Sequence, residues 1–227
     1  MSSQKNRVAI VLTNHAELGT TGKKTGYYLP EAAHAWDVFT RAGYEVVFVS
    51  ARGGEAPLDP GGRDPNDEAS VRFLADPRVQ AQTKETKRPD EIDPRELAAI
   101  YFAGGHGTMW DFRDAKLGAL TAAARDAGAV ISAVCHGPAA LVDQPWISDQ
   151  PVAAFSNAEE KLVELDRIVP FLLEDALAKA GARYSKAAPW AAHVVVGDRL
   201  VTGQNPASSK GVAEAVVAQC AAARVRA

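Results

Sequence analysis

A cysteine and a histidine stand side by side where an apolar segment of the sequence ends. Residues 129–134, Ala-Val-Ile-Ser-Ala-Val, lead directly into Cys135 and His136, and Gly137-Pro138 follow. This order predicts a buried strand, a sharp turn and a helix, the layout of a nucleophile elbow with a thiol in place of the usual serine hydroxyl. Because the N-terminus of a helix stabilises negative charge, we expect Cys135 to be a thiolate nucleophile.

The alternative for any free cysteine is that it is a small residue of the buried core. Cys220 lies in an alanine-rich helical pattern, residues 211–220, and we interpret it as structural. For Cys135, the adjoining histidine, glycine and proline favour the catalytic interpretation. A reactive Cys135 could also act as a redox sensor, since exposed thiolates are readily oxidised.

A glycine-rich segment follows another apolar run. Residues 104–107, Gly-Gly-His-Gly, come directly after the predicted strand 97–103. A dinucleotide-binding loop would need a further glycine where Trp110 stands, so nucleotide binding is disfavoured. The alternative is that Gly105 presents its backbone N–H to a developing oxyanion. His106 either contacts the substrate or hydrogen-bonds the backbone of its own loop.

The elements that must position these residues alternate between strands and helices. Strands are predicted at 8–12, 44–49, 97–103, 129–134 and 152–155, with a hairpin at 193–202. Helices are predicted at 30–41, 67–75, 114–126, 170–180 and from 205 to the end. The charged segment 83–93 is predicted to be exposed. Such alternation predicts a mainly parallel sheet with helices on both faces. Ligands bind beyond the carboxyl ends of the strands in sheets of this kind. We therefore expect Cys135, the 104–107 loop and the polar loop before the first helix to meet at one edge.

Size and composition limit the class of protein. The chain has 227 residues, 47% of them hydrophobic, and a net charge of −3. These values predict one domain, 1–227, with a sizeable core and no basic surface for nucleic acid. The longest apolar stretches are too short for a membrane span, and the first strand begins too early for a signal peptide. Two distant cysteines do not make a disulfide framework, so we expect a reducing compartment, most simply the cytoplasm.

Four motifs occur together, in a fixed order. They are Thr-Gly-Tyr-Tyr-Leu-Pro-Glu-Ala-Ala-His at 25–34, Gly-Gly-His-Gly at 104–107, Ala-Val-Cys-His-Gly-Pro at 133–138 and Leu-Val-Thr-Gly-Gln-Asn-Pro-Ala-Ser-Ser at 200–209. Together they resemble the ThiJ/PfpI superfamily, also called class I glutamine amidotransferase-like, and within it the branch of glutathione-independent glyoxalase III enzymes and heat-shock chaperones. The resemblance implies a flavodoxin-like three-layer α/β sandwich and usually a homodimer.

The resemblance also implies roles for individual residues. It places the nucleophile at Cys135, with His136 as the neighbouring base, and matches Glu31 to a carboxylate that hydrogen-bonds the cysteine sulfur. Without the resemblance, Glu31 would be a first-turn glutamate that complements the helix dipole. The loop that contains Gly104 and Gly105 would contribute oxyanion and substrate contacts.

The acid that orients His136 in this family should lie within 155–160. From the spacing in that segment we choose Glu160, with Glu159 as its rival. True glutamine amidotransferases pair their cysteine with a distant His-x-Glu motif. Here a pair of valines follows the late histidine, His193, so amidotransferase activity is not expected.

The function expected from these residues is conversion of a small reactive 2-oxoaldehyde, methylglyoxal, and water to D-lactate, in stress or detoxification and without a cofactor. The alternatives are a holdase-type stress chaperone and a cysteine hydrolase or peptidase of the same superfamily. No metal is expected, because His15, Glu17 and His34 lack the spacing of a known metal motif. Ligands from separate loops could still come together in the fold.

Overall fold

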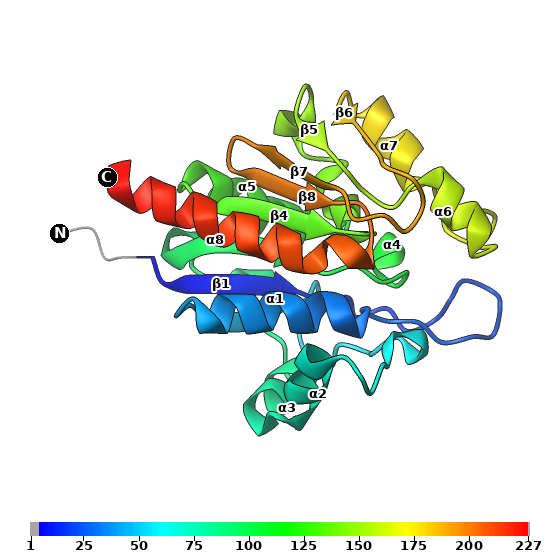
Figure 1. The fold of residues 1–227 in the computed structure, drawn as a ribbon, viewed down its shortest axis with the longest axis horizontal. Helices are drawn as coiled ribbons and strands as arrows, with labels where there is room; N and C mark the ends of the chain where they lie inside the picture. Colours follow the sequence, from blue (N-terminus) through cyan, green and yellow to red (C-terminus); the bar gives the residue numbers. More distant parts are fainter. Residues whose placement is uncertain (1–4, 227) are drawn as a thin grey trace.

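A β-sheet forms the centre of the molecule (Figure 1). It has six strands in the order β2-β1-β3-β4-β8-β7. The computed structural model describes the backbone of residues 5–226 and the side chains of residues 5–223. The strands are β1 (Arg7–Val11), β2 (Glu45–Val49), β3 (Leu97–Phe102), β4 (Val130–Val134), β7 (Val194–Gly197) and β8 (Leu200–Gly203), and β5 (Pro151–Val152) pairs separately with β6 (Arg183–Tyr184). Only the β7–β8 hairpin is antiparallel within the large sheet. The predicted mainly parallel α/β sheet with a hairpin is therefore confirmed.

The strands form because short apolar runs can be buried on both faces. In β1, Val8 and Ile10 belong to one hydrophobic cluster, while Ala9 and Val11 belong to another, and all four side chains are fully buried. Side chains alternate along a strand, so these two clusters lie on opposite faces of the sheet. A continuous apolar run of this kind is typical of a parallel strand that helices cover on both sides.

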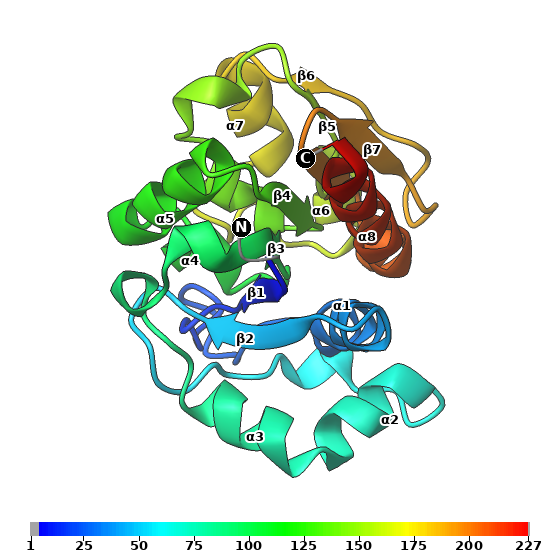
Figure 2. The same cartoon turned by 90° about the vertical axis from the view of Figure 1, so that its left-hand side faces the viewer.

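Two groups of helices cover the two faces (Figure 2). Helices α1 (Leu29–Arg41) and α8 (Ser209–Arg226) pack on one face, where Phe39 and Val216 join the core. Helices α4 (Thr108–Asp111), α5 (Ala115–Asp126) and α7 (Leu173–Lys179) pack on the other face, where Leu117 and Leu177 are buried. The result is a three-layer, flavodoxin-like sandwich. Within residues 5–226, every helix is too short or too polar to cross a lipid bilayer.

Two helices extend the sandwich beside the edge strand β2 (Figure 2). They are α2 (Glu68–Ala75) and α3 (Pro77–Lys84). Helix α3 is not predicted from the sequence, because only Val79 and Thr83 of this polar helix are buried. The prediction that 83–93 is exposed is wrong in part, since Thr86 is buried as well and hydrogen-bonds Gly54.

The segment after β5 also differs from the prediction. The predicted strand 152–155 is reduced to its first residue, because Ser156 and Glu159 form a capping box that begins α6 (Asn157–Leu162). The predicted helix 170–180 is shorter in the structure, where α7 covers Leu173–Lys179. The prediction that no signal peptide precedes β1 concerns residues 1–4 in part, and these lie outside the described residues.

Three loops meet at the carboxyl ends of β1, β3 and β4, as the parallel sheet predicts. The amide of Tyr28 donates to the carbonyl of Gly104 at 3.0 Å. Gly105 has φ +104°, and a Cβ there would lie 2.3 Å from the carbonyl oxygen of Gly26. Only glycine fits this close approach, which joins the loop after β3 to the loop before α1. The loop after β4 carries Cys135.

Candidate active site

Cys135 lies at a sharp, strained turn between β4 and a short helix. Its φ is +59°, in the left-handed region that non-glycine residues rarely adopt. The backbone on both sides fixes the turn: the amide of Cys135 donates to Gly203 O, and its carbonyl accepts from the amide of Phe155, each at 2.9 Å. A Cβ at Gly137 would lie 2.3 Å from Phe102 O, so the next turn requires glycine. The predicted elbow geometry is present.

A chain of polar contacts leads away from the Cys135 sulfur. Sγ lies 3.3 Å from Nδ1 of His136, and Nε2 of His136 lies 2.8 Å from Oε2 of Glu160. Burial alone would raise the pKa of Glu160, but His136 and His106 hold it below its ordinary value. Glu160 is therefore ionised and accepts the Nε2 proton of His136. This tautomer leaves Nδ1 free to accept a proton from the thiol.

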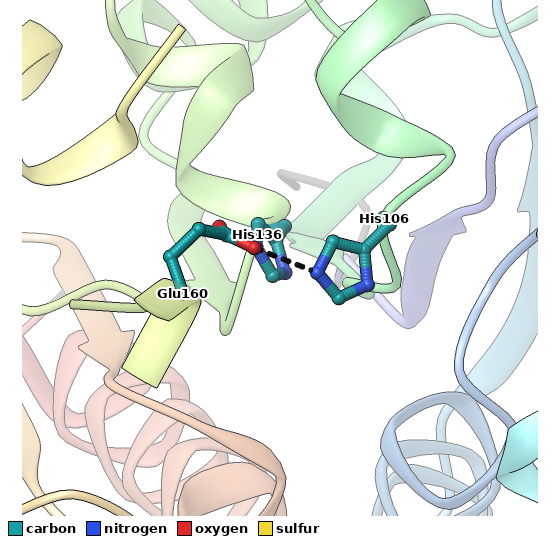
Figure 3. Close-up of side chains that lie close together, drawn as sticks. All are labelled: His106, His136 and Glu160. Atoms are coloured by element: carbon teal, nitrogen blue, oxygen red, sulfur yellow. Dashed lines mark hydrogen bonds and ion pairs between the residues drawn. The ribbon is translucent and has the colours of Figure 1, made fainter. Parts of the chain in front are cut away.

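His106 lies beside His136 and contacts the other oxygen of the same carboxylate (Figure 3). Its Nε2 is 2.9 Å from Oε1 of Glu160, and its ring centroid is 4.2 Å from that of His136. Burial is the main cause of a lowered pKa of His136, and His106 lowers it further. His136 is consequently neutral near neutral pH, as a general base must be before it takes a proton.

Glu31 enters the site from the first turn of α1 and is fully buried. Its Oε2 accepts the amide proton of Gly104 at 2.6 Å. Burial raises the pKa of Glu31 to about 8, although the Cys135 thiol and the Gly104 amide both lower it. Its Oε1 has no hydrogen-bond partner within the described residues. Near neutral pH this carboxyl is mostly protonated.

The prediction of a stabilised thiolate at Cys135 is wrong. Burial, and then the Glu31 carboxyl, raise the pKa of the thiol well above its ordinary value, and the amides of Gly105 and His136 lower it by less. The expected helix is only a 3₁₀ helix, Gly137–Leu141, whose short length gives a weak dipole. Cys135 is 4% exposed. A buried thiol of this kind stays protonated until a base removes its proton.

Gly104 and Gly105, in the loop after β3, have different roles. The amide of Gly104 is already used by Glu31, so Gly104 holds the carboxyl and does not fit the expected role in substrate binding. The amides of Gly105 and His136 both interact with the sulfur of Cys135. A substrate oxygen on a carbon bound to that sulfur would lie near the same two donors, as an oxyanion site requires.

Two neighbouring glutamates on α6 have different partners. Glu160 contacts the two histidines, whereas Glu159 accepts hydrogen bonds from the amide of Trp190 and from Nδ2 of Asn205, each at 2.9 Å, and from Ser156. These donors hold the pKa of Glu159 low despite its burial. The geometry places Glu160 beside His136 and gives Glu159 a structural position.

Two aromatic residues pack beside the site. The ring centroid of Phe155 lies 4.3 Å from that of His136, and the ring centroid of Trp190 lies 5.7 Å from that of Phe155. Phe155 ends an apolar run directly before a capping serine, which is a usable pattern. Trp190 has φ +66° and is 48% exposed, and nothing local in the sequence indicates its position.

The two histidines considered as metal ligands in the sequence, His15 and His34, lie apart from this chain of contacts. Nε2 of His34 is 3.0 Å from the carboxylate of Asp67. His15 stacks on Trp110 with ring centroids 4.9 Å apart, and its Nε2 contacts the carbonyl of Glu17 at 2.6 Å. These two histidines therefore have local partners of their own.

Comparison with known families gives a match over most of the chain. A profile of the DJ-1/PfpI family matches residues 25–219. The chain belongs to the DJ-1/PfpI family. This agrees with the resemblance found in the four sequence motifs.

Two curated relatives in this family cover nearly the whole chain. Glyoxalase 3 of Candida albicans is 30% identical over 93% of this chain and 97% of its own length. Glutathione-independent glyoxalase HSP31 of Saccharomyces cerevisiae is 31% identical over 91% of this chain and 94% of its own length.

Solved structures are also similar to this chain over nearly its whole length. The crystal structure of glyoxalase III from Candida albicans superimposes on this chain with a TM-score of 0.86 at 29% identity, covering 95% of this chain and 98% of that one. The Rapid Encystment Protein 24 kDa of Francisella tularensis has a TM-score of 0.90 at 37% identity, covering 95% of this chain and 99% of that one.

Proposed function

We propose that this protein is a glutathione-independent glyoxalase that converts a small 2-oxoaldehyde and water to a 2-hydroxy acid, methylglyoxal to D-lactate. The observation that carries the proposal is the alignment of Cys135, His136 and Glu160 beside the buried carboxyl of Glu31. The names of the two curated relatives support the same reaction.

The first step is addition of the thiol to the aldehyde. His136 Nδ1, 3.3 Å from the sulfur, accepts the thiol proton while Sγ forms a bond to the aldehyde carbon. The ionised Glu160 stabilises the imidazolium that results. The aldehyde oxygen takes a proton from the protonated carboxyl of Glu31, which becomes a carboxylate, and the product is a hemithioacetal on Cys135. Amides of Gly105 and His136 would stabilise the oxygen while it is negative.

The second step moves a hydrogen between two carbons. A base removes the proton from the hemithioacetal carbon, giving an enediol, and a proton returns to the neighbouring carbon. The product is a 2-hydroxy thioester of Cys135. Glu31, left as a carboxylate by the first step, suits this transfer because its raised pKa, about 8, makes it a stronger base than an ordinary glutamate. Water then hydrolyses the thioester, which releases the hydroxy acid and restores the thiol.

The burial of the nucleophile favours small substrates. Cys135 is 4% exposed, and the rings of His136 and Phe155 lie in contact beside it. A two- or three-carbon dicarbonyl needs little space around the sulfur, whereas an extended peptide would need an open cleft. We therefore favour the oxoaldehyde over the peptide or amide substrates of a hydrolase.

The test is formation of D-lactate from methylglyoxal in the absence of glutathione, measured with a D-lactate-specific dehydrogenase. The parent protein is compared with Cys135→Ser and Glu31→Gln. We expect catalysed D-lactate formation by the parent and its loss in both variants. Full turnover by Cys135→Ser, or no turnover by the folded parent, would refute the proposal. A homodimeric state and a cytoplasmic location stay predictions for sedimentation and cell fractionation.

A further inference from the structure

We propose that His106, His136 and Glu160 form a binding site for a divalent transition-metal ion, Zn²⁺ above all, and that the bound ion switches Cys135 off. The three side chains come from the loop after β3, the turn after β4 and helix α6 (Figure 3). One ligand atom from each lies within 4.8 Å of the other two. Two imidazole nitrogens and one carboxylate oxygen are a donor set that Zn²⁺ takes in tetrahedral sites with an open fourth position.

The distances between the ligand atoms of these three side chains are close to those of a metal site. The Nε2 atoms of His106 and His136 lie 2.9 Å and 2.8 Å from the two oxygens of Glu160. Tetrahedral Zn²⁺ with bonds of about 2.1 Å separates a nitrogen and an oxygen ligand by about 3.4 Å. The carboxylate must therefore withdraw by about half an ångström, and the two imidazole ligand nitrogens, which lie within 4.8 Å of each other, must also settle at about 3.4 Å. Both Nε2 atoms already face the carboxylate.

The charge and exposure of the cluster suit a cation. Among the side chains of residues 5–223, the ion-pair partners of Glu160 are the two histidines, and no lysine or arginine lies within ion-pair distance of it. A buried carboxylate without a fixed cation gains from a divalent ion. The side chain of His106 is 19% exposed, while those of His136 and Glu160 are 0% and 3% exposed. An ion would therefore reach the cluster from the side of His106.

A metal on Nε2 changes what His136 can do for Cys135. A neutral imidazole that coordinates through Nε2 carries its proton on Nδ1. Nδ1 lies 3.3 Å from the Cys135 sulfur, so it becomes a hydrogen-bond donor to sulfur and can no longer accept the thiol proton. The ion also occupies Glu160, which otherwise stabilises the imidazolium. This inhibitory effect rests on the proposed function, whereas the binding of the ion does not.

Binding is tested without substrate, by calorimetric titration with Zn²⁺ and by the visible absorption of tetrahedral Co²⁺. We expect one ion per chain in the parent, in Cys135→Ser and in the control His34→Ala. His106→Ala and His106→Gln, each checked for its fold by circular dichroism, should bind Zn²⁺ at least about tenfold more weakly. No binding by the parent, loss of binding in Cys135→Ser, or unchanged affinity in both His106 variants would overturn the site.

Inhibition is tested on the parent enzyme with methylglyoxal. Stoichiometric Zn²⁺ should suppress D-lactate formation, and a chelator should restore it. Full activity of the enzyme with Zn²⁺ bound would overturn the switch. An inactive parent that still binds Zn²⁺ in calorimetry would refute the glyoxalase proposal and leave the metal site standing, so the two failures are distinguishable.

Discussion

The two cysteines of the chain are almost equally buried, yet their surroundings differ. Cys135 is 4% exposed and Cys220 is 6% exposed. Cys135 lies at a strained turn beside an imidazole nitrogen, a buried carboxyl and two backbone amides. Cys220 lies in the regular helix α8, and its sulfur points to the carbonyl of Ala98 at 3.5 Å. Burial therefore does not separate a reactive cysteine from a structural one, but the polar groups around the sulfur do.

The largest difference between these regions should appear in activity. Cys135→Ala removes the nucleophile and should lower kcat/KM for methylglyoxal by about a thousandfold or more. The matched variant Cys220→Ala lies far from the reacting groups and should keep kcat/KM within about twofold of the parent. Steady-state kinetics on both variants measures this. Equal losses in the two variants would remove the distinction drawn between the two sulfurs.

Two adjacent glutamates on α6 test the same difference between a reacting residue and a structural one. Glu160→Gln removes the charge that stabilises protonated His136 and should lower kcat by about a hundredfold. Glu159→Gln weakens the hydrogen bonds to Trp190 and Asn205, and should lower the free energy of unfolding by about 1–3 kcal/mol with little effect on kcat. Kinetics and urea unfolding on both variants separate the two roles. A larger loss of kcat in Glu159→Gln than in Glu160→Gln would assign the catalytic role to Glu159 and the structural role to Glu160.

The site should also lower the stability of the folded protein, in a pH-dependent way. Glu31 has a pKa of about 8 in the folded protein against an ordinary value of 4.5. Between these values the folded state holds a proton that the unfolded chain has released. The contribution of Glu31 to stability is thus fully present below pH 4.5 and is lost as the pH rises towards 8.

Glu31→Gln removes this titration. At pH 7 the variant should therefore be more stable than the parent, by on the order of 2 kcal/mol, and the gain should shrink toward pH 4.5. Urea unfolding of both proteins across this pH range provides the measurement. A variant that is less stable than the parent at every pH would show that Glu31 is not held at a raised pKa.

The same contrast explains what the sequence predicts and what it does not. Strands β1, β3 and β4 are predictable because their apolar runs are buried on both faces, and the residues that follow them meet because parallel strands share one edge. Helix α3 is polar and gives no such pattern. Placing Glu160 beside His136 takes a family resemblance, since the contact between α6 and the turn after β4 is long-range.

The protonation of the site is the part that local sequence predicts worst. The helix-dipole argument favours a thiolate at Cys135, yet burial and Glu31 outweigh it. Both opposing effects come from distant parts of the chain that pack around the sulfur. A short sequence motif specifies the turn and leaves its electrostatics to the rest of the fold.

The proposed mechanism requires a carbon–sulfur bond between methylglyoxal and Cys135, and this bond can be detected. The parent protein is mixed with methylglyoxal without glutathione, quenched in acid during turnover and analysed by peptide mass spectrometry. We predict an adduct of one methylglyoxal on the peptide that contains Cys135, forming and decaying at the rate of D-lactate production, with none on the peptide that contains Cys220. D-lactate production without any adduct on Cys135 would contradict the account.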